Sequence, residues 1–403
     1  MVRRWPTFKL NELGALQRGR SRHRPRNDPS LYGGDFPFIQ TSDVKDASLY
    51  VTKYDQTYNE RGLAQSQIWP RGTLCITIAA NVAETAILGI EACFPDSIVG
   101  FTPDPNRADV RFVKYSIDIL KTRMQNISRG ATQDNLSVDK LLSFALPCPD
   151  VNAQRRIADI VSAYDVLIEN NARRIAVLEE VGCALYREWF VEFRAPCSFS
   201  KGVKVWKSVV LGQISSYINR GVAPKYSEGG EYAINQRCIR DGQVNLEVAR
   251  QHATKVPADK YVRQGDILVN STGVGTLGRV GQVLVAVAKY TVDTHVSIVR
   301  PSEHVNSDFL GIQLLLKEPE IQAMGVGSTG QTELSRSRLA EVQVCNPPAE
   351  IQAKFGMLVR PLRMQAQGLL AKNRVLCATR DLLLPKLISG ELDVSHLPAP
   401  DTT

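Results

Sequence analysis

The chain has 403 residues, of which 43% are hydrophobic and 22% charged, as expected for an ordinary globular protein of two to three domains. Its net charge of +8 is compatible with nucleic acid or another polyanion as a partner, although many basic proteins bind neither. The eight cysteines are scattered without a C-x-x-C pair, which argues against a zinc site and against a disulfide framework.

The chain begins with "MVRRWPTFKL", which lacks the apolar core of a signal peptide. No apolar run approaches the roughly 18 residues that are needed to span a membrane. The cysteine pattern is typical of a reducing compartment. We therefore expect a cytoplasmic protein that makes no membrane contact.

The first 149 residues are rich in predicted strands that are punctuated by Gly and Pro, for example "GTLCITIAANVAETAILGI". After the turn "PCPDV", apolar residues alternate at spacings of four and three, which predicts a helix with a coiled-coil seam. A single helix over residues 152–190 would be about 58 Å long at 1.5 Å per residue. The seam positions are Ile157, Val161, Tyr164, Ile168, Ile175, Leu178 and Leu185.

The second half of the chain follows the same plan. Its strand-rich part contains "GDILVNSTGVG" and "GRVGQVLVAVAKYTVDTHVSIVR", and the turn "CNPPAEI" precedes a second helix. Pro361 lies early in that helix and is expected to kink it or to delay its start. The seam positions are Phe355, Val359, Leu362, Leu369, Leu376 and Leu383.

The chain is an internal repeat. A shift of 198 residues aligns Leu13-Gly14 with Leu211-Gly212, and Gln154 with Gln352. In the middle of each copy the shift falls to 195 for "FPFIQTSDVKD" against "EYAINQRCIRDG", and to 193 for "RGTLCIT" against "QGDILVN". Such drift is typical of changed surface loops on a common scaffold.

These elements predict an α+β protein with an internal pseudo-twofold repeat, in which two strand-rich domains alternate with two long helices. The helices are expected to pair with each other as an antiparallel coiled coil, with separate packing onto the globular parts as the alternative. The boundaries that we expect are domain 1 over 1–149, a helix over 150–194, domain 2 over 195–346, a helix over 347–393 and a flexible tail over 394–403.

The repeated combination resembles the specificity subunits of type I restriction-modification enzymes. The resemblance rests on "GATQDNLS" or "GSTGQTELS", a proline turn, a Gln, and a heptad helix that ends in "ALYREWF" or "LLLPKLISGEL". It covers essentially the whole chain in both copies. It implies two target-recognition domains, each of which reads one half of a bipartite double-stranded DNA sequence, and two antiparallel helices that set the spacing between the halves.

The resemblance also implies the partners. Two adenine-methyltransferase subunits would dock on the helices, and motor-nuclease subunits would join that core. The chain itself would be a non-catalytic subunit without cofactor or metal, and S-adenosylmethionine, ATP and Mg²⁺ would belong to the partner subunits.

Two kinds of position are candidates for DNA contact. The loop "RGRSRHRPR" offers five guanidinium groups that suit phosphate contact or bidentate pairing with guanine, and the polar strand ends "IQTSDVKD" and "INQRCIRDG" suit base reading. The resemblance adds the "GATQ" and "GSTGQ" loops. The candidates are Arg18, Arg20, Arg22, Arg24, Arg26, Thr41, Ser42, Lys45, Thr132, Gln133, Arg220, Lys225, Gln236, Arg237, Arg240, Thr329 and Gln331.

Each candidate also has a structural interpretation. The arginine loop can be a solvated basic loop, and the strand ends can be ordinary turns whose side chains bond their own backbone. Trp189 and Phe190 close the first helix and are expected to pack rather than to stack on bases. As a whole, the chain can instead be a protein-binding scaffold with duplicated domains, or a two-domain enzyme with a cleft between them.

Two motifs point to cofactor chemistry and are set aside. "GVGTLG" at 273–278 matches a dinucleotide fingerprint, but the residues after it predict a strand instead of the helix that would hold a pyrophosphate. "CNPPAEI" has Ala349 where an amino-methyltransferase carries an aromatic residue that stacks on a flipped base. The prolines are therefore expected only to precede a helix.

Overall fold

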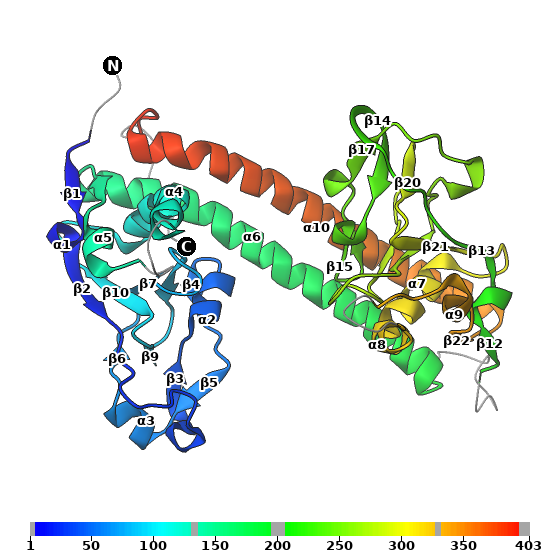
Figure 1. Cartoon of the computed structure of the whole chain (residues 1–403), viewed down its shortest axis with the longest axis horizontal. Helices are drawn as coiled ribbons and strands as arrows, with labels where there is room; N and C mark the ends of the chain where they lie inside the picture. The colour runs from blue at the N-terminus through cyan, green and yellow to red at the C-terminus, as the bar shows by residue number, and fades with distance from the viewer. Residues whose placement is uncertain (1–4, 130–135, 195–205, 327–331, 395–403) are drawn as a thin grey trace. The chain divides into compact units, whose positions relative to one another are not determined.

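The computed structural model describes residues 5–129, 136–194, 206–326 and 332–394. The chain forms two compact units: unit 1 comprises Met1–Ala172 and Ala371–Thr403, and unit 2 comprises Arg173–Leu370 (Figure 1). Each unit therefore holds one strand-rich part and one half of each of two long helices, α6 (Val151–Tyr186) and α10 (Ala349–Ser389). No helix in these described ranges has the length and apolarity that crossing a membrane requires.

Unit 1 is built on a five-stranded sheet and a four-stranded sheet. The larger sheet has the order β2 (Gly14–Arg18), β10 (Ile98–Pro103), β7 (Leu74–Thr77), β8 (Thr85–Leu88) and β4 (Tyr50–Val51). The smaller sheet has the order β5 (Gln56–Tyr58), β3 (Tyr32–Phe38), β9 (Ala92–Cys93) and β6 (Ile68–Trp69). A two-stranded ribbon, β1 (Thr7–Lys9) with β11 (Ala145–Pro147), leads into α6, and α4 (Val110–Arg129) shares the core of the larger sheet.

Unit 2 repeats this plan. Its four-stranded sheet has the order β13 (Ser215–Arg220), β21 (Val296–Pro301), β18 (Ile267–Asn270) and β19 (Val280–Gln282). Its smaller sheets contain β17 (Arg250–His252), β14 (Tyr226–Ile234) and β20 (Tyr290–Val292), and the hairpin β15 (Ile239–Arg240) with β16 (Gln243–Val244). The ribbon β12 (Ser208–Val210) with β22 (Gln343–Cys345) leads into α10, and α7 (Ser307–Leu316) takes the place of α4.

The backbone hydrogen bonds confirm the repeat in the middle of each copy. The Ile78 amide donates to the Ser97 carbonyl, and the Ser271 amide donates to the His295 carbonyl, which keeps the shift of 193 for the buried strand. β3 and β14 are also equivalent strands. Each has an irregularity in its pairing register, which ends at Phe36 in β3 and at Glu231 in β14, so the predicted shift of 195 is confirmed here.

The alignment of Leu13-Gly14 with Leu211-Gly212 is wrong by three residues. The Leu13 carbonyl accepts from the Asp104 amide, whereas the carbonyl that accepts from the equivalent Ser302 amide is that of Ile214. The shift at the start of the copies is therefore 201. Strand pairing decides this register, because a strand must keep its hydrogen-bond partners, while the two Leu-Gly pairs do not occupy equivalent positions.

The two helices pair in both units, which confirms the predicted antiparallel arrangement (Figure 1). In unit 1 the first half of α6 shares a core with the last turns of α10, where Ile157 packs in the same cluster as Leu387. In unit 2 the second half of α6 packs on the first half of α10, where Ile175 clusters with Ala366 and Leu369. Of the thirteen expected seam residues, the buried ones are Ile157, Val161, Ile175, Phe355, Val359 and Leu369, and the half-buried ones are Tyr164, Ile168, Leu178, Leu185, Leu362, Leu376 and Leu383.

Polar residues interrupt the seam within unit 1. Asn171 donates through Nδ2 to Asn373 Oδ1 at 2.8 Å, and Asn373 donates in turn to the Ile168 carbonyl at 3.1 Å. Arg380 pairs with the buried Asp165 carboxylate at 2.6 Å. These bonds can form only in one register of the two helices, because a polar seam residue needs its partner at one fixed height.

Two expectations about the helix ends have clear outcomes. α10 runs without a break from Ala349 through Pro361, so the expected delay of its start is wrong; Pro361 itself is exposed. Trp189 and Phe190 are buried and contact the ring of Phe355, which confirms that they pack.

The proline junction contains a buried glutamine in each copy. Gln154 donates through Nε2 to the Pro149 carbonyl at 2.9 Å and accepts at Oε1 from the Asp109 amide at 3.0 Å, just before α4. Gln352 likewise donates to the Pro347 carbonyl at 2.8 Å and accepts from the Asn306 amide at 3.0 Å, just before α7. The junction occurs in both copies because this side-chain amide connects the start of each long helix, α6 or α10, to the start of α4 or α7.

We predict that Gln154→Ala lowers the free energy of unfolding by about 1–3 kcal/mol, because it leaves a buried amide and a buried carbonyl without a partner. Urea unfolding of the purified chain measures the change. The matched control is Gln365→Ala, at an exposed position of α10, which should change the free energy by less than about 0.5 kcal/mol. Equal effects of the two substitutions would contradict the role of the junction.

Candidate nucleic-acid interface

In both units, three segments meet at the end of the central buried strand, β7 in unit 1 and β18 in unit 2. They are the turn after that strand, the first residue of the helical turn that follows β3 or β14, and the residue that precedes β10 or β21. The hydrogen-bond register makes these positions equivalent in the two copies. The equivalent pairs are Ala79 and Thr272, Thr41 and Gln236, and Ser97 and His295.

In unit 1 these positions line a cavity of about 490 Å³. Thr41, at the start of α2 (Thr41–Asp46), lies in its wall together with Ala79 and Ser97, whose small side chains leave the space open. Amide groups add polar atoms to the wall: Gln40 donates through Nε2 to Gln56 Oε1 at 2.7 Å. The cavity thus offers hydrogen-bond donors and acceptors of the kind that read base edges.

The arginine loop forms another side of this cavity, through Ser21 and Arg26, and the next residue, Asn27, also lines it. Three of its guanidinium groups converge on Asp96. Arg18 donates through Nε and Nη2 to the Asp96 carbonyl at 3.0 and 2.8 Å, and Arg26 Nη2 lies 2.5 Å from the Asp96 carboxylate. Arg24 lies 3.7 Å from the same carboxylate. Asp96 therefore holds the loop through both its backbone carbonyl and its carboxylate, while the Arg24 and Arg26 side chains remain about half exposed.

Two further contacts hold this loop. The Tyr32 hydroxyl donates to the Arg26 carbonyl at 2.7 Å, and burial beside Tyr58 raises the pKa of Tyr32 to about 12, so the hydroxyl remains a donor at neutral pH. His23 Nε2 lies 2.8 Å from the Asp28 carboxylate. The backbone amide of Ser30, which donates to Asp28, lowers the pKa of that carboxyl.

In unit 2 the equivalent positions carry larger side chains that bond one another. Gln236 donates through Nε2 to Thr272 Oγ1 at 2.7 Å, and Thr272 Oγ1 lies 2.7 Å from His295 Nδ1. Thr276 Oγ1 donates to Gln236 Oε1 at 3.2 Å. The His295 amide donates to Asp293, and burial raises the pKa of that carboxyl. We call Gln236, Thr272, Thr276 and His295 the polar cluster.

Four of the remaining predicted residues of unit 1 are described and lie outside the cavity wall. Arg20 is half-buried and Arg22 exposed, and neither lines the cavity. Ser42 and Lys45 are exposed on α2. Thr132 and Gln133 in this copy, and Thr329 and Gln331 in the other, lie outside the described residues.

The predicted cations of unit 2 are placed differently from one another. Arg220 donates to Glu333 at 2.6 Å and to the Leu334 carbonyl at 2.7 Å, and Leu334 is bonded to Ser271, next to the polar cluster. Arg237 is exposed and follows Gln236 directly. Two of the predicted cations lie elsewhere: Lys225 is exposed beside Thr254, and Arg240 pairs with Asp241 on the β15–β16 hairpin.

Several residues of these surfaces were missed from sequence: Gln40, Gln56, Asp96 and Ser97 in unit 1, and Thr272, Thr276 and His295 in unit 2. The signal for some of them was present, because the repeat alignment gives Thr272 as the second residue after a buried strand in one copy, where Ala79 has that place in the other. Asp96 had no such signal, since it lies 70 residues along the chain from Arg26.

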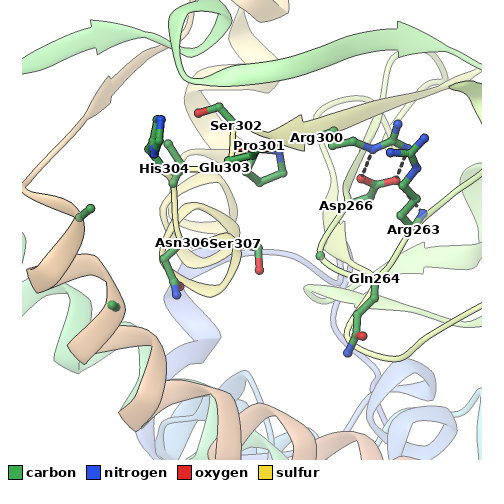
Figure 2. A pocket seen from close by; sticks show the side chains of 14 residues that line it. Arg263, Gln264, Asp266, Arg300, Pro301, Ser302, Glu303, His304, Asn306 and Ser307 are labelled. Carbon is green, nitrogen blue, oxygen red and sulfur yellow. Dashed lines mark hydrogen bonds and ion pairs between the residues drawn. The ribbon is translucent and has the colours of Figure 1, made fainter.

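Unit 2 also contains a hollow of about 570 Å³. It lies at the opposite end of β18 and β21 from the polar cluster. Figure 2 shows Asp266 in its wall, facing Arg300 through two hydrogen bonds of 2.8 Å. Because this guanidinium is already neutralised by a buried carboxylate, and Glu303 adds another acid to the wall, the hollow is less suited to a nucleic acid than the polar cluster.

The turn at 273–278 leads directly into β19, which confirms the prediction that a strand follows these glycines. The segment therefore does not present the helix N-terminus that a dinucleotide-binding fingerprint requires. It forms part of the polar cluster instead, through Thr276.

Comparisons with known proteins agree with this architecture. A family model described as the type I restriction modification DNA specificity domain matches residues 3–180 and again residues 204–358. The chain therefore belongs to this family and is a type I DNA specificity subunit.

Individual relatives cover most of the chain. It is 24% identical over 420 residues to the type I restriction enzyme MjaIX specificity subunit of Methanocaldococcus jannaschii, covering 98% of this chain and 94% of the relative. It is 23% identical over 336 residues to the HindI specificity subunit of Haemophilus influenzae, covering 66% and 72%. A crystal structure of the type I restriction-modification system S subunit from M. genitalium has the same fold, with a TM-score of 0.63, 17% identity, and coverage of 95% of this chain and 96% of that one.

We predict that Asp96→Ala reduces the preference for the DNA target over a scrambled duplex about tenfold. The substitution removes charge-assisted bonds that order the arginine loop, while the released guanidinium groups still attract any phosphate. Fluorescence anisotropy on both duplexes at one fixed salt concentration measures the ratio.

The control for this experiment is Asp139→Ala, which removes the same charge from an exposed position of α5 (Val138–Leu142). It should leave the preference unchanged. If both substitutions lower the preference equally, net charge and not the loop geometry is responsible.

Proposed function

We propose that each unit reads one half of a bipartite double-stranded DNA target. The observation that carries this proposal is the equivalence of Thr41, Ala79 and Ser97 in unit 1 with Gln236, Thr272 and His295 in unit 2. One backbone arrangement presents different side chains in the two copies. Two readers of this kind recognise two unrelated half-sites, since base reading depends on the donors, acceptors and apolar groups that are presented.

The two long helices would set the spacing between the half-sites. Support comes from the way each reader is joined to them. In unit 1 the Tyr115 hydroxyl of α4 donates to Asp165 of α6 at 2.6 Å, and in unit 2 Gln243 donates to Glu179 of α6 at 2.5 Å. A reader that is bonded to the helices in this way keeps its place on them, as a spacer requires.

The helices also carry exposed apolar residues that the repeat duplicates. Val166 of α6 and Val375 of α10 are 47% and 66% exposed in unit 1. At a shift of 198 residues they correspond to Met364 of α10 and Val177 of α6 in unit 2, which are 40% and 58% exposed. Exposed apolar groups at repeat-related positions suit two copies of one partner protein. In our proposal these partners are two adenine-methyltransferase subunits.

The remaining parts of the proposal concern the partners. Motor-nuclease subunits would complete the complex, and S-adenosylmethionine, ATP and Mg²⁺ would be bound by the partner subunits. The chain itself would act in the cytoplasm as a non-catalytic subunit. Its family membership supports this division of labour.

Mapping of methylated adenines tests the reading role. The chain is expressed with its cognate methyltransferase in a host without adenine methylation, and methylated sites are mapped with and without the chain. We expect a bipartite motif only when the chain is present, and exchange of residues 1–149 for those of another specificity subunit should change one half of the motif. An assembled complex that produces no motif would instead favour the protein-binding scaffold.

For the docking surfaces, we predict that Val177→Glu or Val375→Glu lowers the methyltransferase stoichiometry from two copies to one, because each places a charge in one of two equivalent apolar contacts. Native mass spectrometry of the co-purified complex measures the number of bound methyltransferase copies. Val248→Glu, at an exposed position of the short helix Leu246–Val248, is the control and should leave two copies bound. Two copies on either helix variant would show that these residues do not form the contact.

A further inference from the structure

Val274 lies at the tip of the turn between β18 and β19, on the same turn as two members of the polar cluster. Its side chain is 79% exposed, more than any other large hydrophobic side chain in the described part of the chain. A single exposed valine needs no explanation on an ordinary surface. This one lies among the groups that are proposed to read bases.

The turn holds Val274 in a fixed position. Its neighbours Gly273 and Gly275 have φ of 104° and 71°, conformations that favour glycine. The Leu277 amide donates to the Gly273 carbonyl at 3.0 Å, and the Gly278 amide donates to the Asn270 carbonyl at 2.8 Å. Valine itself has a stiff χ1 angle, so the isopropyl group loses little freedom when something contacts it.

The same turn is joined to the base-reading groups. A Cβ atom on Gly273 would lie 2.3 Å from Thr276 Oγ1 and 2.5 Å from Gln236 Oε1, so the backbone beside Val274 touches the polar cluster directly. Arg279 donates to the Gly275 carbonyl at 3.0 Å, which places a cation on the turn. Hydrogen-bonding groups and a cation around one apolar projection suit the major groove better than an apolar protein surface.

Unit 1 differs at this position. The turn after β7 in unit 1 is two residues shorter, because the shift of 193 residues between β7 and β18 becomes 195 between β8 and β19. No residue of that shorter turn, 78–84, is an exposed large hydrophobic, so this projection belongs to unit 2, as expected of a residue that contributes to the difference between two half-sites.

We infer that Val274 contacts the 5-methyl group of a thymine in the half-site that unit 2 reads, and so determines specificity at that base pair. The inference rests on the proposed function. The thymine methyl group is the apolar feature that base edges present in the major groove, and it distinguishes T·A from the other pairs. A rigid isopropyl group that stands beside hydrogen-bonding side chains is complementary to it.

The test replaces each thymine of the unit 2 half-site in turn by deoxyuridine, which removes only the methyl group. The assembled complex with its methyltransferase should bind one of these duplexes about fourfold more weakly than the parent, as expected for the loss of one buried methyl group. With Val274→Ala or Val274→Asn the same replacement should change affinity less than about twofold, because the partner of the methyl group is gone.

The matched control is Val285→Ala. Val285 is exposed in the same unit, but lies two residues after Val283, whose carbonyl accepts from the Gly265 amide at 2.8 Å, away from the polar cluster. This variant should keep the full fourfold effect of deoxyuridine.

Several results would overturn the inference: a half-site without thymine, a wild-type complex that is indifferent to every deoxyuridine, or a Val274→Ala complex that still responds like the wild type. Loss of methyltransferase from the Val274→Ala complex would assign the residue to a protein contact and would also overturn it. Failure of the proposed function is distinguishable, since then no bipartite motif depends on the chain at all.

Discussion

The pairing of α6 with α10 is the constraint on which both units depend. Neither helix lies outside the recognition domains as a separate rod, because helix residues belong to the domain cores. Ile157 and Val161 of α6 are fully or nearly fully buried in the core of unit 1, and Phe355 and Val359 of α10 are fully buried in that of unit 2. Each strand-rich part therefore completes its core only when the helices are in place, and burial of these large side chains contributes several kcal/mol to each unit.

Buried charges then make the attachment specific. In unit 1, Asp165 of α6 accepts from both Tyr115 and Arg380, and in unit 2 the buried Arg363 of α10 donates to Gln282 of β19. Burial lowers the pKa of Arg363, while Asp308 and Glu179 favour its charged form. A buried charge is tolerated only where its partners are correctly placed, so these residues favour one position of each domain on its helices over shifted ones.

On this shared frame the two candidate surfaces have diverged by side-chain size. Small residues at Thr41, Ala79 and Ser97 leave a cavity that is bordered by the arginine loop, whereas the larger equivalents in unit 2 hydrogen-bond one another. The backbone register is kept because the strands below it are buried on both faces, as the fully buried pattern of β7 and β18 shows. The side chains at the ends of these strands are half-buried or exposed, so they can change at less cost to the core.

The sequence by itself determined the duplicated plan, the two long helices, their pairing and the strand after "GVGTLG", because these follow from hydrophobic periodicity and from local turn residues. The sequence also placed Thr41 and Gln236 among the candidates, because each is a polar residue that follows the end of a predicted strand. Only the tertiary structure decided that the first strands align at a shift of 201, that Arg18, Arg24 and Arg26 converge on Asp96, and that Ser97 and His295 belong to the candidate surfaces. These outcomes depend on strand pairing and on contacts between residues far apart in the chain, for which a single sequence contains no local signal.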